Sequence, residues 1–301
     1  MKKKIILIII LIIIFGLIIT YNLNNNQFEK FNNNEDETTC IYVSSHGIKK
    51  SCANIDNCTY IKSDHLHSFN IPETPFILVT GDEDTTIPDD SKEKVNSILN
   101  SPNLIHWYSQ NLNYLGNTKL SSIPIGLDYH TLANGKYDSW GKQESPKKQE
   151  DFILRLERKP FEQRELKLYI NFNNSIHGKY GKKDRKDALE QIPKNLQVIE
   201  ENSILRKETW ENMCKYSFVV SPHGNGLDCH RTWEALVLGC IPVVKTSSLN
   251  ILYDNLPVLI VNNWYDVNEE LLKNTIEEFK IKTFNYDKLK LEYWINKIKN
   301  N

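Results

Sequence analysis

The most informative part of the chain covers residues 218–236 and reads FVVSPHGNGLDCHRTWEAL. Its apolar start predicts the end of a buried strand, and the residues from Leu227 onward have the pattern of a helix. Gly224 and Gly226 lie in the loop between the two. A glycine-rich loop of this kind brings backbone N–H groups and the positive end of a helix dipole to one point, where a diphosphate can bind. The segment therefore predicts an anion-binding site at the carboxyl edge of a parallel sheet.

Side chains in and after this loop suit a nucleotide sugar. His223, His230 and Arg231 offer positive or hydrogen-bonding groups to phosphates, and only the arginine is always charged at neutral pH. Glu234 follows Arg231 by three residues, so a helix brings both to nearly the same face, where the carboxylate can accept sugar or ribose hydroxyls. The alternative is a simple surface ion pair between these two. The predicted donor-binding residues are Ser221, His223, Gly224, Asn225, Gly226, His230, Arg231 and Glu234.

The same region resembles the donor site of the exostosin-like glycosyltransferases. The resemblance covers residues 218–264 and rests on Pro222-x-Gly224, Arg231-x-x-Glu234-Ala235 and the sequence GCIPVV at 239–244. It implies a GT-B-like fold, in which two Rossmann-like domains face each other across a cleft and the carboxyl-terminal one holds the nucleotide sugar. It also implies that Arg231 contacts the diphosphate and Glu234 the nucleotide or sugar hydroxyls. His223 departs from the family pattern, which commonly has arginine there, while IPIGLD at 123–128 resembles the end of the family's amino-terminal domain.

The rest of the chain is typical of an α/β protein of two domains. It has 301 residues, of which 40% are apolar, and short apolar runs alternate with helical patterns. We expect strands at 40–43, 76–80, 104–108, 123–125, 168–172, 197–199, 218–221, 241–245 and 258–261, and helices at 152–158, 185–191, 204–215, 227–238, 249–255, 267–280 and 286–299. These elements predict an acceptor-side α/β domain at 40–150, a nucleotide-sugar-binding α/β domain at 151–285 and a carboxyl-terminal helix at 286–301.

The amino end predicts a membrane anchor. Three lysines at positions 2–4 precede an uncharged apolar run at 5–21, which is long enough to enter a bilayer with its basic flank in the cytosol. A cleaved signal peptide is the alternative, but the end of the run lacks the small-x-small cleavage pattern. Residues 22–39 are rich in asparagine and predict a flexible stem. We therefore expect a single-pass type II membrane protein whose catalytic part faces the lumen of the Golgi or endoplasmic reticulum, if the source is eukaryotic or viral.

The six cysteines fit no zinc-binding pattern. A lumenal location permits a disulfide among Cys40, Cys52 and Cys58, whereas Cys240 lies within an apolar run and is expected to be a buried free thiol. Glycosylation sequons begin at Asn57 and Asn173, as expected for a lumenal glycoprotein.

An inverting transferase needs a general base that takes the proton from the attacking hydroxyl. The candidates are Asp128, Asp82 and His46, because each follows a predicted strand of the first domain, although capping a turn is the alternative for each. Asp82 and Asp84 also form an Asp-x-Asp sequence, which holds Mn²⁺ on the donor diphosphate in the other large transferase fold. The glycine loop lies late in this chain, which argues against that fold. We therefore expect no required metal cofactor and keep Mn²⁺ at Asp82 and Asp84 as the alternative.

These patterns together predict a hexosyl- or pentosyltransferase that moves a sugar from a nucleotide-diphosphate donor to a hydroxyl of a glycan or glycoprotein. The formal net charge is -1, with 37 basic and 38 acidic residues, and provides no field that attracts nucleic acid. The alternative is a non-catalytic carbohydrate- or nucleotide-binding protein on the same fold. Arg231 and Glu234 together favour the enzyme, since a lectin needs no diphosphate site.

Overall fold

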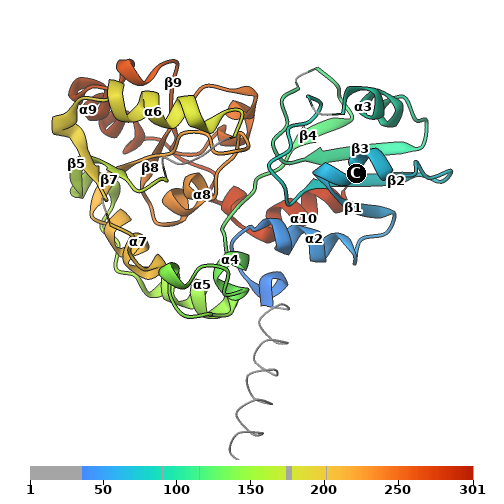
Figure 1. The fold of residues 1–301 in the computed structure, drawn as a ribbon, viewed down its shortest axis with the longest axis horizontal. Helices are drawn as coiled ribbons and strands as arrows, with labels where there is room; N and C mark the ends of the chain where they lie inside the picture. The colour runs from blue at the N-terminus through green and yellow to red at the C-terminus, as the bar shows by residue number, and fades with distance from the viewer. Residues whose placement is uncertain (1–35, 90, 115, 174–177, 201, 301) are drawn as a thin grey trace, which may run out of the picture.

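A computed structural model describes residues 36–300, apart from positions 90, 115, 174–177 and 201. It contains two separate sheets, each made only of parallel strands and accompanied by helices (Figure 1). The chain is therefore an α/β protein with two parallel sheets, an arrangement consistent with two Rossmann-like domains. We refer to the part that contains β1–β4 as the amino-terminal unit and to the part that contains β5–β9 as the carboxyl-terminal unit.

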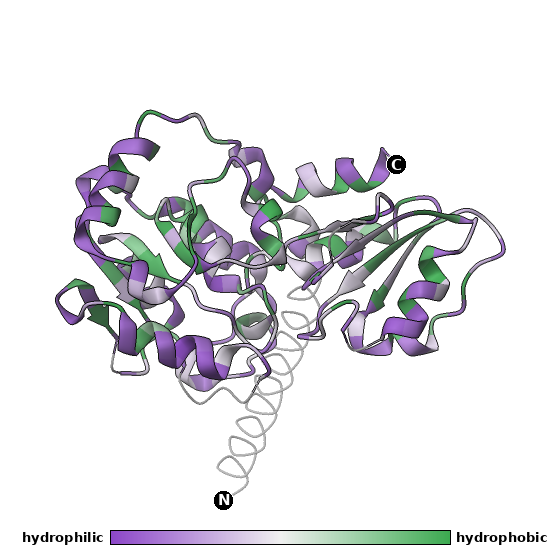
Figure 2. Cartoon of the chain, turned by 90° about the horizontal axis from the view of Figure 1, so that it is seen from above, coloured by the Kyte–Doolittle hydropathy of each residue, from purple (hydrophilic) through white to green (hydrophobic). Residues whose placement is uncertain are grey.

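The sheet of the amino-terminal unit has the order β1-β2-β3-β4. Its strands are β1 (Cys58–Lys62), β2 (Phe76–Gly81), β3 (Leu104–Ser109) and β4 (Leu120–Ser122), and its helices include α2 (Ser45–Cys52) and α3 (Lys92–Leu99). All residues of β2 are buried, which explains why this strand reads as an unbroken apolar run. Figure 2 shows that hydrophobic residues gather in the strands, whereas the outer helices carry mostly hydrophilic residues.

Two strands predicted in this unit are wrong. Residues 40–43 form no strand, because Tyr42 makes only an isolated antiparallel bridge, with Lys290 near the end of the chain. The predicted strand at 123–125 is also wrong, because β4 ends just before it, at Ser122. Pro124 has no N–H to donate to a neighbouring strand. The edge strand β1 was not predicted, because all five of its residues are only partly buried and its sequence, CTYIK, has no apolar run.

The sheet of the carboxyl-terminal unit has the order β6-β5-β7-β8-β9. Its strands are β5 (Glu165–Ile170), β6 (Gln197–Ile199), β7 (Tyr216–Val220), β8 (Ile241–Lys245) and β9 (Leu259–Val261), and its helices are α6 (Gly181–Gln191), α7 (Arg206–Met213), α8 (His230–Val237) and α9 (Glu269–Phe279). All five strands were predicted to within a few residues. Chain order reverses between β5 and β7, which makes their carboxyl ends the expected ligand-binding position of such a sheet.

Two further helices join the units, and a third returns to the first one. The connection contains α4 (His130–Ala133) and α5 (Pro146–Arg155), and α5 begins before the predicted helix at 152–158 because Ser145 caps it and Pro146 occupies its first turn. The last helix, α10 (Leu291–Lys299), packs beside α2 of the amino-terminal unit (Figure 1). The chain thus crosses back after the second sheet is complete.

Short 3₁₀ helices complete the structure. They are η1 (Asp36–Thr39), η2 (Ser63–Ser68), η3 (Asp138–Trp140), η4 (Phe161–Gln163), η5 (Lys194–Leu196), η6 (Ser248–Tyr253), η7 (Trp264–Asp266) and η8 (Tyr286–Leu289). Glu37 of η1 is buried, so the last residues of the predicted stem belong to the folded part. The predicted α-helix at 249–255 is instead the shorter 3₁₀ helix η6.

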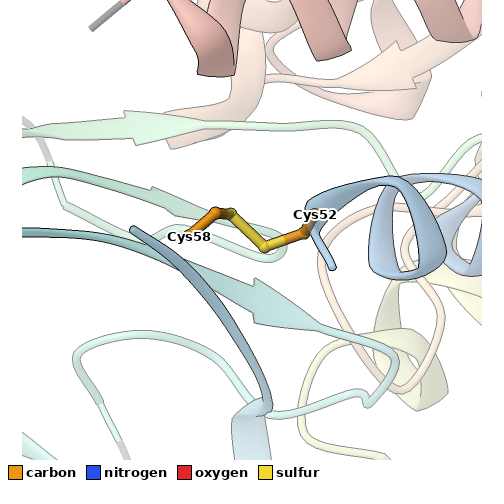
Figure 3. Close-up of a disulfide and its surroundings, with 2 residues drawn as sticks. All are labelled: Cys52 and Cys58. Atoms are coloured by element: carbon orange, nitrogen blue, oxygen red, sulfur yellow. A yellow bond between two sulfur atoms is a disulfide. The ribbon is translucent and has the colours of Figure 1, made fainter. Parts of the chain in front are cut away.

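Cys52 and Cys58 form a disulfide that joins the end of α2 to the start of β1 (Figure 3). A disulfide within the predicted set of three cysteines is therefore confirmed, and Cys240 is a buried free thiol as expected. The predicted anchor at 5–21 and the stem up to residue 35 lie outside the described residues. Among the helices that are described, none is both long and apolar enough to span a bilayer.

Candidate functional site

A cleft of about 1120 Å³ lies where the carboxyl ends of β5, β6 and β7 meet the amino-terminal unit. One wall consists of residues at or just after the ends of these strands, at 171–173, 199–200, 202–204, 224–225 and 228–231. The facing residues come from the amino-terminal unit and the connection, and they are Asp84, Ile125, Asp128, Tyr137, Ser139 and Trp140. A ligand at the switch point of the second sheet would therefore contact both parts of the chain.

The predicted glycine loop forms part of this cleft and is held firmly from two sides. The N–H of His223 donates to a carboxylate oxygen of Asp184 on α6 (2.9 Å). On the other side, a Cβ atom at Gly226 would lie 2.6 Å from the side-chain amide nitrogen of Asn111, which follows β3. Only glycine fits such a close approach. The loop is thus fixed between the two units.

Asp228 connects the units directly behind the loop. Its buried carboxylate accepts the indole N–H of Trp233 (2.9 Å) and the backbone N–H of Ile125 (2.8 Å) in the amino-terminal unit. Burial raises the pKa of Asp228 to about 6. Its contacts are structural, and they position the start of α8, which carries the next cleft residues.

Two arginines face the cleft beside the loop. Arg231 on α8 and Arg185 on α6 lie 5.5 and 5.6 Å from the centre of the Phe172 ring. Arg231 donates from Nε to the side-chain oxygen of Asn171 (2.9 Å), and Arg185 donates to the carbonyl oxygen of Asn173 (2.6 Å). Within the part of the chain that the structure describes, neither forms a salt bridge with a carboxylate. They form a cationic pair without an anion.

The surroundings of the two arginines disfavour their charged forms. Burial lowers the pKa of Arg231 to about 10, and the neighbouring charge of Arg185 adds to the effect. Burial also lowers the pKa of Arg185. Sequence reasoning missed Arg185, because it lies in the charged run KKDRKD, which reads as a solvated helix face. An anion placed between the two arginines would relieve both the burial and the repulsion.

Glu234 has a different partner from the one expected. It is buried and forms a salt bridge with Arg206, the first residue of α7, so the alternative surface pair with Arg231 is wrong. Arg206 lies 4.7 Å from the centre of the Trp140 ring. Burial raises the pKa of Glu234, and Arg206 opposes this shift. Arg206 also lines the cleft and has a buried Nε atom without a hydrogen bond among the described residues.

The other predicted donor residues divide into two groups. Gly224, Asn225 and His230 line the cleft together with Arg231 and Glu234. Ser221 instead shares a buried hydrogen bond with Thr232 (2.8 Å), and the Nδ1 atom of His223 bonds to the carbonyl oxygen of Leu227 (2.8 Å). These side chains shape the loop, and they are not among the residues that line the cleft.

Asp128 lies in the opposite wall of the cleft and is buried. It accepts the backbone N–H of Thr131 (3.0 Å), and Nδ1 of His130 lies 3.3 Å from the same oxygen. Burial opposes the ionisation of Asp128, but His230, His130 and Arg206 together outweigh it and hold its pKa well below the usual range. Asp128 is therefore ionised at neutral pH and faces the cleft.

The other two candidate bases lie behind Asp128. His46 Nε2 is 2.9 Å from Asp82, and Lys49 binds the second oxygen of that carboxylate at 3.0 Å. The His46 ring packs against His130, with ring centres 4.5 Å apart. Burial lowers the pKa of His46, but Asp82 and Glu37 outweigh it and raise the pKa to about 9. The three candidates thus belong to one network, of which Asp128 borders the cleft.

Of the two carboxylates in the alternative Mn²⁺ site, Asp82 and Asp84, only one lines the cleft. Asp84 lines it, whereas both oxygens of Asp82 are engaged by His46 and Lys49. Among the described residues, the group of three side chains with metal-binding potential is Asp128, His130 and His230.

Neither a protein-family model nor a curated protein matches this sequence. A functional assignment therefore depends on the residues of the cleft.

Proposed function

We propose that this protein is a glycosyltransferase that moves a hexose or pentose from a nucleoside diphosphate to a hydroxyl of a glycan or glycoprotein. The observation that carries the proposal is the pair of buried Arg185 and half-buried Arg231, two guanidinium groups beside Phe172 that form no salt bridge with a carboxylate among the described residues. Buried charges are normally paired. A diphosphate supplies the missing negative charge and matches the fork geometry of arginine.

The elements around the pair support a nucleotide as its ligand. The amino end of α8 lies on the same side of the cleft as the glycine loop, and the N–H groups of its first turn would contribute to the phosphate site. Residues 202–204, which follow β6, provide a neighbouring surface for the nucleoside. In this proposal, Arg206 and its partner Glu234 bind the hydroxyls of the transferred sugar. A cleft of about 1120 Å³ is large enough for a nucleotide sugar and part of an acceptor.

The proposed reaction is a displacement at the anomeric carbon. The acceptor hydroxyl forms the new bond to this carbon while the bond to the diphosphate oxygen breaks, and the electron pair leaves with the diphosphate. Arg185 and Arg231 stabilise the charge that develops on the leaving group. Asp128 takes the proton of the hydroxyl, because it is ionised and is the candidate base that borders the cleft. Asp82 and His46 support this wall from behind.

The proposal includes the type II membrane anchor at 5–21 and a lumenal catalytic part. The disulfide between Cys52 and Cys58 is consistent with an oxidising compartment. The acceptor would then be a glycan or glycoprotein that passes through the same lumen.

Calorimetric titration of the full-length protein in detergent tests the proposal. The ligands are UDP, GDP, CMP and their sugars, each with and without Mn²⁺. We expect saturable binding of one nucleoside diphosphate and its sugar without metal. Binding that requires Mn²⁺ would favour Asp82 and Asp84 as ligands. Binding of free glycans alone would favour a non-catalytic carbohydrate-binding protein, and binding of none of the nucleotides would contradict the proposed donor site.

A further inference from the structure

We propose that Asp128, His130 and His230 form a binding site for a divalent transition-metal ion such as Zn²⁺. One ligand atom from each residue lies within 4.8 Å of the others, and Oδ1 of Asp128 lies 3.3 Å from Nδ1 of His130. Ligand atoms about 2 Å from a shared tetrahedral ion are about 3.3 Å apart. One pair already has this spacing, and side-chain adjustments of about 1 Å would bring in the third ligand.

The ligands are held in suitable orientations by backbone groups. Nδ1 of His230 lies 2.8 Å from the carbonyl oxygen of Gly126, to which it donates its proton, so that Nε2 keeps its lone pair for an ion. Histidines that bind metals usually donate a hydrogen bond from the N–H of their second ring nitrogen in this way. Asp128 is oriented in turn by the backbone N–H of Thr131. Two of the three ligands are thus fixed before any ion binds.

Carboxylates pair with several of the cations near the cluster. His46, which packs against His130, lies between Asp82 and Glu37, so any positive charge on it is balanced by carboxylates. Two other nearby cations are likewise paired, Lys49 with Asp82 and Arg206 with Glu234. These pairings reduce the repulsion that the three cations would exert on an ion.

The ligand types select the class of ion. Two imidazoles and one carboxylate suit Zn²⁺, Co²⁺ or Fe²⁺, whereas Mg²⁺ and Ca²⁺ prefer oxygen ligands alone. Asp128 and His230 line the cleft, so the remaining coordination positions would be open to a cleft ligand. Asp128 and His130 follow β4, while His230 begins α8, and an ion at this position would connect the two units.

An ion at the metal site would affect sugar transfer, and this effect rests on the proposed function. Because the ion would bind the carboxylate that we assign as the proton acceptor, Zn²⁺ is expected to inhibit sugar transfer. Ion binding itself does not depend on any assignment of activity. Stimulation by Zn²⁺ would contradict the role of Asp128 as a free base while leaving the metal site in place.

Metal titration of the full-length protein, purified with a chelator that is then removed, tests the site. We expect one Zn²⁺ per chain, and a dissociation constant more than about 100-fold higher in His130→Gln and His230→Gln, since the loss of an outer partner alone typically costs about 10–100-fold. His67→Gln is the matched control, because His67 is exposed and lies outside the cluster. Unchanged affinity in both cluster variants, or no saturable binding to the wild type, would overturn the proposal.

The absorption spectrum of Co²⁺-loaded wild type gives a test that needs no variant. Nitrogen and oxygen ligands give weak visible d–d bands, whereas a thiolate ligand adds a strong near-ultraviolet charge-transfer band. We expect d–d bands that Zn²⁺ abolishes by competition, without the thiolate band. A thiolate band would show that free cysteines, and not Asp128 and the histidines, hold the ion.

Discussion

Replacing Arg231 with alanine should weaken the binding of a nucleoside diphosphate by about 1.5–3 kcal/mol, the usual scale of a charge-assisted hydrogen bond. This corresponds to a dissociation constant about 10–150 times higher at 25 °C. The Nε–H of Arg231 donates to the side-chain oxygen of Asn171. Its two terminal nitrogens make no hydrogen bond within the described part of the chain, so they are available to phosphate oxygens.

The same substitution should change the stability of the free protein little. Arg231 is half-buried next to Arg185, and both desolvation and this neighbour disfavour its charge and lower its pKa. Alanine removes that cost together with the contacts to Asn171 and Phe172, so the two effects oppose each other. We expect a change of less than about 1 kcal/mol in the free energy of unfolding. Calorimetry of binding and urea denaturation therefore separate a ligand-binding role from a structural one.

Two further variants sharpen this test. Arg155→Ala removes an exposed arginine of α5 that does not line the cleft, and it should leave the affinity unchanged. Arg185→Ala should weaken binding like Arg231→Ala, and the double variant should lose less than the sum, because both groups act on one ligand. Unaltered nucleotide affinity in a folded Arg231→Ala protein would refute the assignment of the diphosphate site.

Three other substitutions test how the site is held. Asp184→Ala should lower the free energy of unfolding by about 1–3 kcal/mol in urea denaturation, because the indole N–H of Trp264 and the N–H of His223 lose their acceptor. An unchanged denaturation midpoint would contradict this role of Asp184. Gly226→Ala should weaken nucleotide binding in calorimetry, since its Cβ would push against Asn111, and full affinity would show that the loop tolerates displacement. Burial lowers the pKa of His46, but two carboxylates outweigh this and raise the pKa to about 9, above the value in the unfolded chain. The ion pairing of His46 therefore stabilises the folded protein fully below pH 6.5, and this contribution is lost as the pH rises through 9. Wild type should therefore lose about 2–3 kcal/mol more between pH 6 and 10 than His46→Gln, and equal losses would refute the ion pairing.

The carboxyl-terminal unit was easier to predict than the amino-terminal one for a physical reason. Central parallel strands are buried on both faces and read as continuous apolar runs, as in β7 and β8, whose residues are almost all buried. The edge strand β1 is only partly buried, so its sequence gives no such signal. Cys40 and Val43 lie in the core and Tyr42 packs against it, yet this segment pairs with residues near Lys290 and not with a strand. That partner is distant in the sequence.

The site was predictable only where its residues follow one another in the chain. The glycine loop, Arg231 and Glu234 occur together at the end of a strand, and they form a recognisable pattern. Arg185 and Arg206 come from α6 and α7, and their positions depend on how these helices pack against the sheet. The network from Asp82 through His46 to Asp128 likewise depends on long-range packing, because Asp82 follows β2, His46 lies in α2 and Asp128 lies just before α4.

The most direct test of the central claim is a transfer assay with the full-length protein, in which each nucleotide sugar is combined with a panel of glycan and glycoprotein acceptors. The measured quantity is the acceptor-dependent release of nucleoside diphosphate. We expect release by the wild type with the one nucleotide sugar that binds, and a rate about 10²–10⁴-fold lower in Asp128→Asn. Tight binding of a nucleotide sugar without release in the presence of any acceptor would contradict the transferase assignment and leave a non-catalytic nucleotide-binding protein.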